Sequence, residues 1–175
     1  MMQWPPSLAA HTEPPATDAD IAAFVGSVFV PLSDNEIRDL HVEHKAAVGD
    51  GCFDPPFDPA TWQLPIRPLP DSYLSFLRYS NGGYFAGTNR DFDPLFNTRE
   101  VRDYMLGYSI PHWMPSSCPI GFDGGGTFYL LDMRRESDIG DYPVLFAHAG
   151  NLGYDEAIIL ANSFAELIAN QLGKP

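Results

Sequence analysis

The chain has 175 residues, about the length of one domain, and its hydrophobic fraction of 45% is enough for a core that needs neither a metal nor a disulfide. Asp and Glu outnumber Lys and Arg by 23 to 10, which gives a formal net charge of −13. The sequence has no cluster of basic residues, which argues against nucleic-acid and anionic membrane partners, because both need grouped cations. The charge suits either a basic partner, through electrostatic steering, or solubility alone.

The first residues and the two cysteines favour a cytoplasmic protein. Residues 1–16 contain four prolines and lack the basic start and apolar run of a signal peptide, so we expect a mobile or loosely docked arm. Cys52 and Cys118 lie far apart and belong to no metal-ligand spacing. We therefore expect two reduced thiols and no metal centre.

Two capping patterns predict helices in the first third of the chain. Thr17 and Asp20 have the spacing of a capping box with Asp in place of Glu, and Ser33 with Glu36 forms a clearer one. Apolar residues follow Ser33 at helical spacing until Gly49, which can end the second helix.

A proline-rich stretch separates these helices from the rest. Residues 49–70 contain six prolines, which forbid a regular helix and most ladder hydrogen bonds, so we expect an insertion or crossover on the surface. A helix is predicted directly after it, because Pro70 fits a first helical turn and an aromatic and leucine pattern follows. Residues 81–83, Asn-Gly-Gly, are expected to end that helix.

The second half of the chain has a strand-rich pattern. Asn97 and Glu100 predict a short helix, and residues 119–133 place a run of glycines between two apolar runs, as in a β-hairpin. Residues 144–147 and 157–160 have the length of strands, and Ser163 with Glu166 caps a terminal helix. Helices, then strands, then a helix predict a single α+β domain with an antiparallel sheet of about four to six strands.

The motifs that suggest catalysis are weak. Residues 123–126, Asp-Gly-Gly-Gly, are not followed by the lysine of a phosphate loop, so a hairpin turn explains them better. His41 and His44 share one helix face but lack the order of a zinc motif and a third ligand. Cys118 and His148 are a nucleophile pair only if the fold brings them together, and an acidic chain rarely activates a thiolate.

The acids are candidates for a partner-binding face, although a solvated acidic rim and a pair of glycosidase-type carboxylates remain alternatives. Residues 1–60 carry ten acids and two bases, so we expect the leading helices to supply much of such a face. The candidate partner-binding residues are Asp34, Glu36, Asp39, Glu43, Asp123, Glu136, Asp138 and Asp141.

Four segments, in this order, resemble the SUKH superfamily, which includes the Smi/Knr cell-wall assembly regulators. They are a Leu-Pro helix start at residues 69–77, the Asn-Gly-Gly at 81–83, a glycine-containing strand pair at 119–132, and an Ala-x-Ser-Phe helix start at 161–167. The matching fold-motif residues are Leu69, Pro70, Tyr73, Phe76, Leu77, Asn81, Gly82, Gly83, Gly121, Gly125, Gly126, Tyr129, Asp132, Ser163 and Phe164.

The resemblance covers about residues 66–172 and implies helices around an antiparallel sheet. We thus divide the chain into an arm at 1–16 and one domain at 17–175, in which residues 17–65 hold the leading helices and the proline-rich insertion. Two departures stand out: the insertion before the Leu-Pro motif, and the first 30 residues, for which we recognise no counterpart in the family.

The family implies a protein without catalytic residues or a cofactor. Many bacterial members are taken to be immunity proteins that bind and silence a polymorphic toxin, often a nuclease, so the expected partner is a basic toxin domain. A scaffold or regulator unrelated to toxins is the alternative. A hydrolase built on the scattered carboxylates and histidines is a lesser one.

Overall fold

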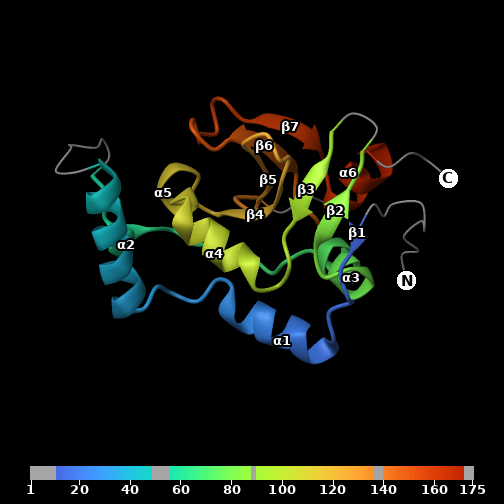
Figure 1. Ribbon diagram of the computed structural model, residues 1–175, viewed down its shortest axis with the longest axis horizontal. Helices are drawn as coiled ribbons and strands as arrows, with labels where there is room; N and C mark the ends of the chain where they lie inside the picture. Colours follow the sequence, from blue (N-terminus) through green and yellow to red (C-terminus); the bar gives the residue numbers. More distant parts are fainter. Residues whose placement is uncertain (1–10, 49–55, 88–89, 136–139, 172–175) are drawn as a thin grey trace.

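The computed structural model describes residues 11–48, 56–87, 90–135 and 140–171, and these residues form an α+β domain (Figure 1). The helices are α1 (Asp18–Ser27), α2 (Asp34–Val48), α3 (Asp71–Tyr79), α4 (Glu100–Gly107), α5 (Ile110–Trp113) and α6 (Phe164–Gln171), with a short 3-10 helix η2 (Pro59–Thr61). The strands are β1 (His11–Thr12), β2 (Gly83–Phe85), β3 (Phe92–Leu95), β4 (Ser117–Phe122), β5 (Thr127–Asp132), β6 (Val144–His148) and β7 (Ile158–Ala161).

The strands form one antiparallel sheet in the order β1 to β7, so each strand of the described chain pairs with its sequence neighbours. The α+β class is confirmed, but the described residues contain seven strands, more than the four to six expected. The additional strands are short and lie at the start of the sheet. None of the helices in the described ranges is long and apolar enough to cross a membrane.

The glycine run forms the predicted hairpin turn. Phe122 pairs with Phe128 across it, and Gly124 and Gly126 have φ angles of +70° and +101°, a conformation that side chains disfavour. The Asp123 carboxylate accepts the backbone N–H groups of Gly125 and Thr127 at 2.8 Å each. These residues therefore close a strand turn, and Asp123 is occupied in holding it.

The two predicted leading capping boxes are present. Thr17 Oγ1 accepts the Asp20 N–H and the Asp20 carboxylate accepts the Thr17 N–H. In the same way, Ser33 Oγ accepts the Glu36 N–H and the Glu36 carboxylate accepts the Ser33 N–H. At α6 only half of the box forms: Ser163 Oγ accepts the Glu166 N–H at 3.0 Å, whereas the carboxylate of Glu166 binds the backbone and side chain of the preceding asparagine.

The Asn-Gly-Gly segment has a different role from the one expected. α3 ends at Tyr79, and Ser80 is already extended, so the glycines do not cap the helix. Gly82 has a φ of +88°, and a Cβ there would lie 2.8 Å from the Asn97 backbone nitrogen; Gly83 faces the carbonyl oxygen of His11. The glycines therefore let the chain turn and approach its neighbours closely.

Of the arm that we expected to be mobile or loosely docked, the structure describes residues 11–16, and these are docked on the domain. His11 pairs with Tyr84 across β1 and β2, and the Glu13 N–H donates to Ser80 Oγ at 3.0 Å. Ala16 is buried and its N–H donates to the Leu77 carbonyl at 2.9 Å. Residues 11–16 therefore belong to the folded domain.

The core lies between the sheet and the helices that pack on it. Many of the fold-motif residues expected from the family resemblance are buried in it. Among them are Leu69, Tyr73, Phe76, Leu77, Tyr129, Ser163 and Phe164. Gly121 allows close packing of β3 on β4, because a Cβ there would lie 2.9 Å from the Pro94 carbonyl oxygen.

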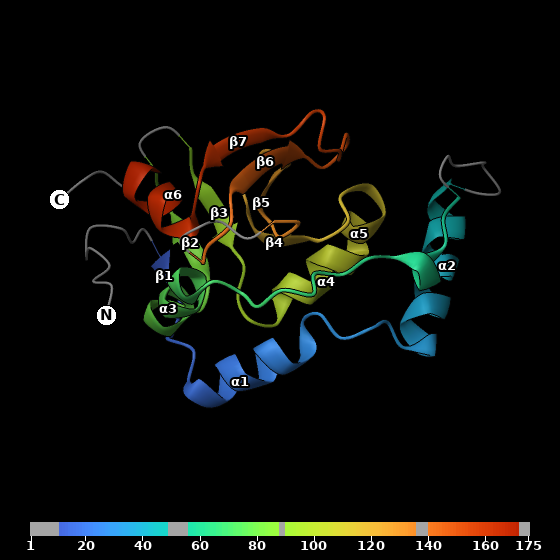
Figure 2. The ribbon, with the colours of Figure 1, turned by 180° about the vertical axis from the view of Figure 1, so that it is seen from behind.

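Helix α2 lies apart from this core. Figures 1 and 2, seen from opposite sides, show it at one end of the molecule, joined by the segment after α1 and by the segment before α3. Among its side chains that the structure describes, Leu40 is the buried one, and the expected apolar face is largely open. We refer below to residues 28–33 as the linker and to residues 56–70 as the strap.

Candidate partner-binding surface

Three of the four acids expected on the second helix are exposed. Asp34, Asp39 and Glu43 lie on α2, away from the sheet. Asp39 is 3.8 Å from the Arg38 guanidinium, but both side chains are about two-thirds exposed, at 69% and 65%, so water weakens their attraction. These three acids therefore leave negative charge at the surface.

Glu36 is different, because the fold uses its carboxylate. It accepts the Ser33 N–H and lies 2.9 Å from Arg102 Nε on α4. The hydrogen bond from Arg102 is the largest cause that lowers the pKa of Glu36 from 4.5 to about 2. Arg102 also donates from Nη1 to the carbonyls of Val28 and Val30, at 3.0 and 3.1 Å. Glu36 is thus a structural contact between α2, the linker and α4, and we remove it from the partner-binding face.

Asp141 is not a surface acid. Its side chain is buried, with 6% of the residue exposed, and it accepts hydrogen bonds from Ser72 Oγ at 2.6 Å and from the Tyr142 N–H at 2.7 Å. A longer bond of 3.4 Å comes from the Phe164 N–H at the start of α6. The carboxylate joins α3 to α6, which is why it is not available to a partner.

Two acids around the hairpin, Asp123 and Asp132, make contacts within the chain. Asp132 is paired with Arg134, which donates to both carboxylate oxygens at 2.8 and 2.7 Å. Glu136 and Asp138 lie outside the described residues. A grouping that the sequence did not indicate brings Asp93 beside Asp123, where their backbones form an isolated bridge. Sequence spacing could not reveal it, because β3 and the hairpin meet only in the folded sheet.

The two histidines of α2 belong to an aromatic cluster. The His44 ring stacks on Phe57 with centroids 3.7 Å apart, and His41 meets the same ring edge-on at 5.9 Å. Phe57 also contacts Trp62 and His112, so the cluster connects α2 to the strap and to α5. Within the described residues, no three His, Cys, Asp or Glu side chains group in a way that could hold a metal ion.

His112 and Trp62 carry the polar atoms of this cluster. The Nε2 of His112 and the Nε1 of Trp62 are buried without a hydrogen-bond partner. Burial, and to a lesser degree the proximity of His44, lowers the pKa of His112. The cluster therefore favours a neutral imidazole at position 112.

Cys118 and His148, which the sequence left open as a nucleophile pair, do not lie close together. Cys118 pairs with Leu131 in the sheet, whereas His148 pairs with Thr127, four residues or about 13 Å along β5. Cys118 is fully buried, and burial raises the pKa of its thiol. It is a core residue, while Cys52 lies outside the described part of the chain.

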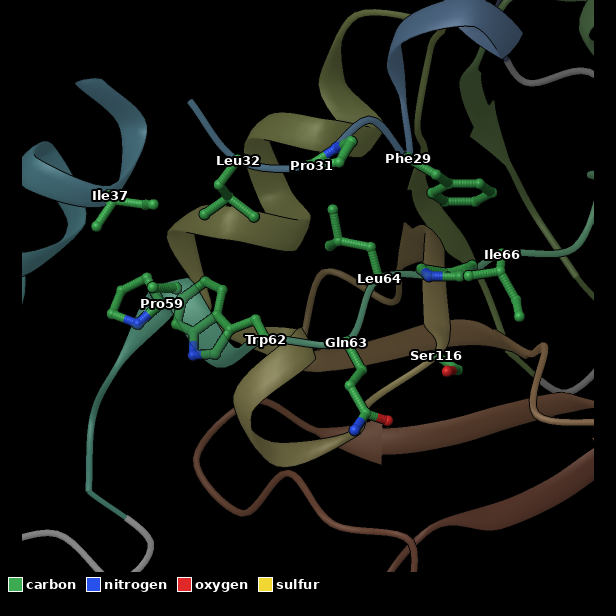
Figure 3. A pocket seen from close by; sticks show the side chains of 12 residues that line it. Phe29, Pro31, Leu32, Ile37, Pro59, Trp62, Gln63, Leu64, Ile66 and Ser116 are labelled. Carbon is green, nitrogen blue, oxygen red and sulfur yellow. The ribbon is translucent and has the colours of Figure 1, made fainter. Parts of the chain in front are cut away.

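A groove runs between the linker and the strap, and the sequence did not predict it. One hollow of about 440 Å³ adjoins a second of about 640 Å³, and both are bordered by Phe29, Pro31, Pro65 and Ile66. Figure 3 shows the side chains of Leu32 and Leu64 pointing into the space between the two segments. The walls are mostly apolar, and segments far apart in the sequence contribute them.

The fold and these sites define an α+β domain with an antiparallel sheet, an acidic helix at one end and an apolar groove beside it. The SMI1 / KNR4 family (SUKH-1) matches the chain over residues 61–170, so the protein belongs to this family. The match includes α3, the glycine hairpin and α6, whose motifs carried the resemblance. None of the curated proteins compared with the chain matches it.

Proposed function

We propose that this protein is a non-catalytic protein-binding domain that acts as an immunity protein: it binds a basic polymorphic toxin domain, such as a nuclease, and neutralises it. The observation that carries the proposal is the exposure of Asp34, Asp39 and Glu43 on a helix that stands apart from the core. Membership of the SMI1 / KNR4 family, together with the net charge of −13, supports the same role.

The electrostatics suit such a partner. A nuclease that binds phosphates has a cationic cleft, and an acidic surface attracts that cleft over a distance of about 10 Å at moderate salt. Complementary charges mainly accelerate association, whereas contacts that form after docking set the dissociation rate. We therefore expect the α2 acids to influence the association rate more than the final affinity.

The test is co-expression with the toxin domain encoded beside the gene, with cell growth as the readout, followed by binding kinetics. The variant D34N/D39N/E43Q removes three exposed charges and leaves Glu36 intact. The matched control E13Q/D155N/E156Q removes three exposed charges elsewhere on the molecule. At low salt we expect the α2 variant to associate about three- to tenfold more slowly, and the difference to vanish near 0.5 M salt.

The control separates a local from a general charge effect. If it slows association as much as the α2 variant, the net charge matters and the place of the acids does not, which contradicts a binding face on α2. If the native protein neither rescues growth nor binds the toxin domain, the immunity role is wrong.

A Smi/Knr-like scaffold or regulator without a toxin partner is the alternative on the same fold. The family match covers residues 61–170 and does not include the acids of α2, on which the immunity proposal depends. The match therefore supports a scaffold or regulator as much as an immunity protein. A gene with no toxin gene beside it, and a stable complex with a non-toxin protein of the same cell, would support this alternative.

A further inference from the structure

We infer that the groove between the linker and the strap binds an amphipathic helix of the partner, with an apolar face that enters the groove and Lys and Arg on the flanks of that face, where they meet the acids at the rim. The inference rests on the proposed function only in taking the partner to be a basic protein. It adds where the partner docks and which kind of segment it presents.

Large apolar side chains at the groove are exposed to solvent. Ile66, in the strap, is 97% exposed, and Val30 and Val25 on the opposite wall are 43% and 47% exposed. A single exposed valine is ordinary, but here three large apolar residues border one continuous hollow. Such a patch indicates a surface that another molecule covers.

The backbone of the walls favours a helix over a strand as the occupant. Pro31 lies on the linker side, and Pro59, Pro65 and Pro68 lie on the strap. Strand addition needs alternate backbone N–H groups on the receiving segment, and proline has none. A helix satisfies its own backbone and requires only apolar contact from the groove. A hollow of about 440 Å³ lies in the range that accepts a few large side chains.

The charges of the surrounding elements favour a cationic occupant. No Asp or Glu lines the two hollows, but the segments that supply the walls, residues 17–48 and 56–72, contain eight Asp and Glu against three Lys and Arg. Two of the eight, Asp18 and Glu36, are paired with Arg78 and Arg102. Asp34 precedes the groove residue Ile37 by one helical turn, Asp58 caps η2 beside Pro59, and Asp71 begins α3 where the strap ends. Arg67 is the one charged residue among those that line the two hollows, so the negative charge lies at the rim of the groove and not inside it.

The same charge argues against a second copy of the chain in the groove. Two molecules with a net charge of −13 each repel one another, and the acids at the rims of their grooves would meet at the interface. An amphipathic cationic helix instead places apolar residues at i, i+3, i+4 and i+7 into the hollows and its Lys and Arg against the acids.

The test uses the full chain and a synthetic peptide of about 15 residues, with leucines at those positions and lysines elsewhere. One comparison peptide has the same composition in scrambled order, and another has glutamates in place of the lysines. Fluorescence anisotropy measures binding of each peptide to the native protein, to I66D and V30D, and to the matched control I159D, whose isoleucine is 64% exposed on β7. Because these side chains are already exposed, thermal unfolding should show that each variant remains folded.

We expect the ordered lysine peptide to bind, and I66D and V30D each to weaken it by about tenfold or more, since a buried isoleucine or valine contributes at least that much. I159D should stay within about twofold of the native protein. Equal binding of the scrambled peptide, or unchanged binding to I66D, overturns the inference. The inference is also overturned if sedimentation shows that the native protein is a dimer and that I66D is a monomer, because the groove then binds a second copy of the chain.

The co-expression assay separates this inference from the proposed function. If I66D still neutralises the toxin as well as the native protein does, the groove is not the docking site although the immunity role holds. If the peptide binds through Ile66 but the protein neutralises no toxin, the immunity role is wrong and the groove is still a binding site for a cationic amphipathic helix.

Discussion

The family-matched core and the α2 end of the molecule are built in different ways. In the core, Phe76 is fully buried and meets Phe85 and Phe164 edge-to-face, with ring centroids 5.3 and 5.5 Å apart. On α2, Leu40 alone is buried among the side chains that the structure describes. The difference suggests that one region provides stability and the other an exposed surface that can change without loss of the fold.

Two of the contacts between described residues attach α2 to the rest of the molecule. One is the ion pair of Glu36 with Arg102, and the other is the aromatic cluster in which Phe57 contacts both His44 and His112. Both contain a group that gains or loses a proton. The comparison can therefore be tested by substitutions in each region and by pH.

The largest expected effect is in the core. Phe76→Ala removes a fully buried aromatic ring and should lower the free energy of unfolding by about 3–5 kcal/mol, the cost typical of such a cavity. The matched substitution on α2, Leu40→Ala, should cost less than about 2 kcal/mol, because fewer neighbours surround it. Urea unfolding followed by circular dichroism measures both. Equal losses would mean that α2 is as much part of the core as α3.

The sequence predicted those parts of the fold whose signals are local. The capping boxes at Thr17 and Ser33 were correct because the residues that make each bond lie three positions apart. The hairpin was correct because its glycines lie between two apolar runs. By contrast, β2 and β3 were missed, since both are short, β3 contains Pro94, a residue that argues against a strand, and both exist only through their pairing with neighbours.

The candidate site was predicted less well, for a physical reason. Asp and Glu are usually exposed, so the sequence favours the surface for Asp141 as for Asp34. The buried Asp141 carboxylate accepts hydrogen bonds from Ser72, 69 positions away, and from the backbone N–H of Phe164 at the start of α6. No local sequence pattern encodes either contact. The groove likewise depends on packing the linker against a strap that lies about thirty residues further along the chain.

A smaller effect is expected at the ion pair that holds α2. Glu36→Gln should lower the free energy of unfolding at pH 7 by about 1–2 kcal/mol, after allowance for the partial exposure of both side chains. The matched substitution of an exposed acid, Asp34→Asn, should stay within about 0.5 kcal/mol. Hydrogen exchange of the α2 amides should show the same order, with faster exchange in the Gln variant.

The pH dependence of this pair has a defined sign. The folded pKa of Glu36, about 2, lies below its ordinary value of 4.5, so the stabilisation is complete above pH 4.5 and is lost as the pH falls toward 2. The difference in stability between the native protein and Glu36→Gln should therefore shrink through that interval. A difference that stays constant down to pH 3 would show that the charge of Glu36 does not hold α2.

The smallest effect is expected at the aromatic cluster, as the pH falls below about 6.5. Burial, with the nearby His44, places the folded pKa of His112 below its ordinary value of 6.5, so the unfolded chain binds the proton more readily. The stability that this site contributes is complete above pH 6.5 and declines as the pH falls below it. His112→Phe keeps a ring against Phe57 and Trp62 and removes the buried, unpartnered Nε2, so its unfolding free energy should fall less steeply with decreasing pH than that of the native protein. If the two curves are parallel, the protonation of His112 does not loosen the end of the molecule, and the ion pair of Glu36 is the acid-sensitive attachment of α2.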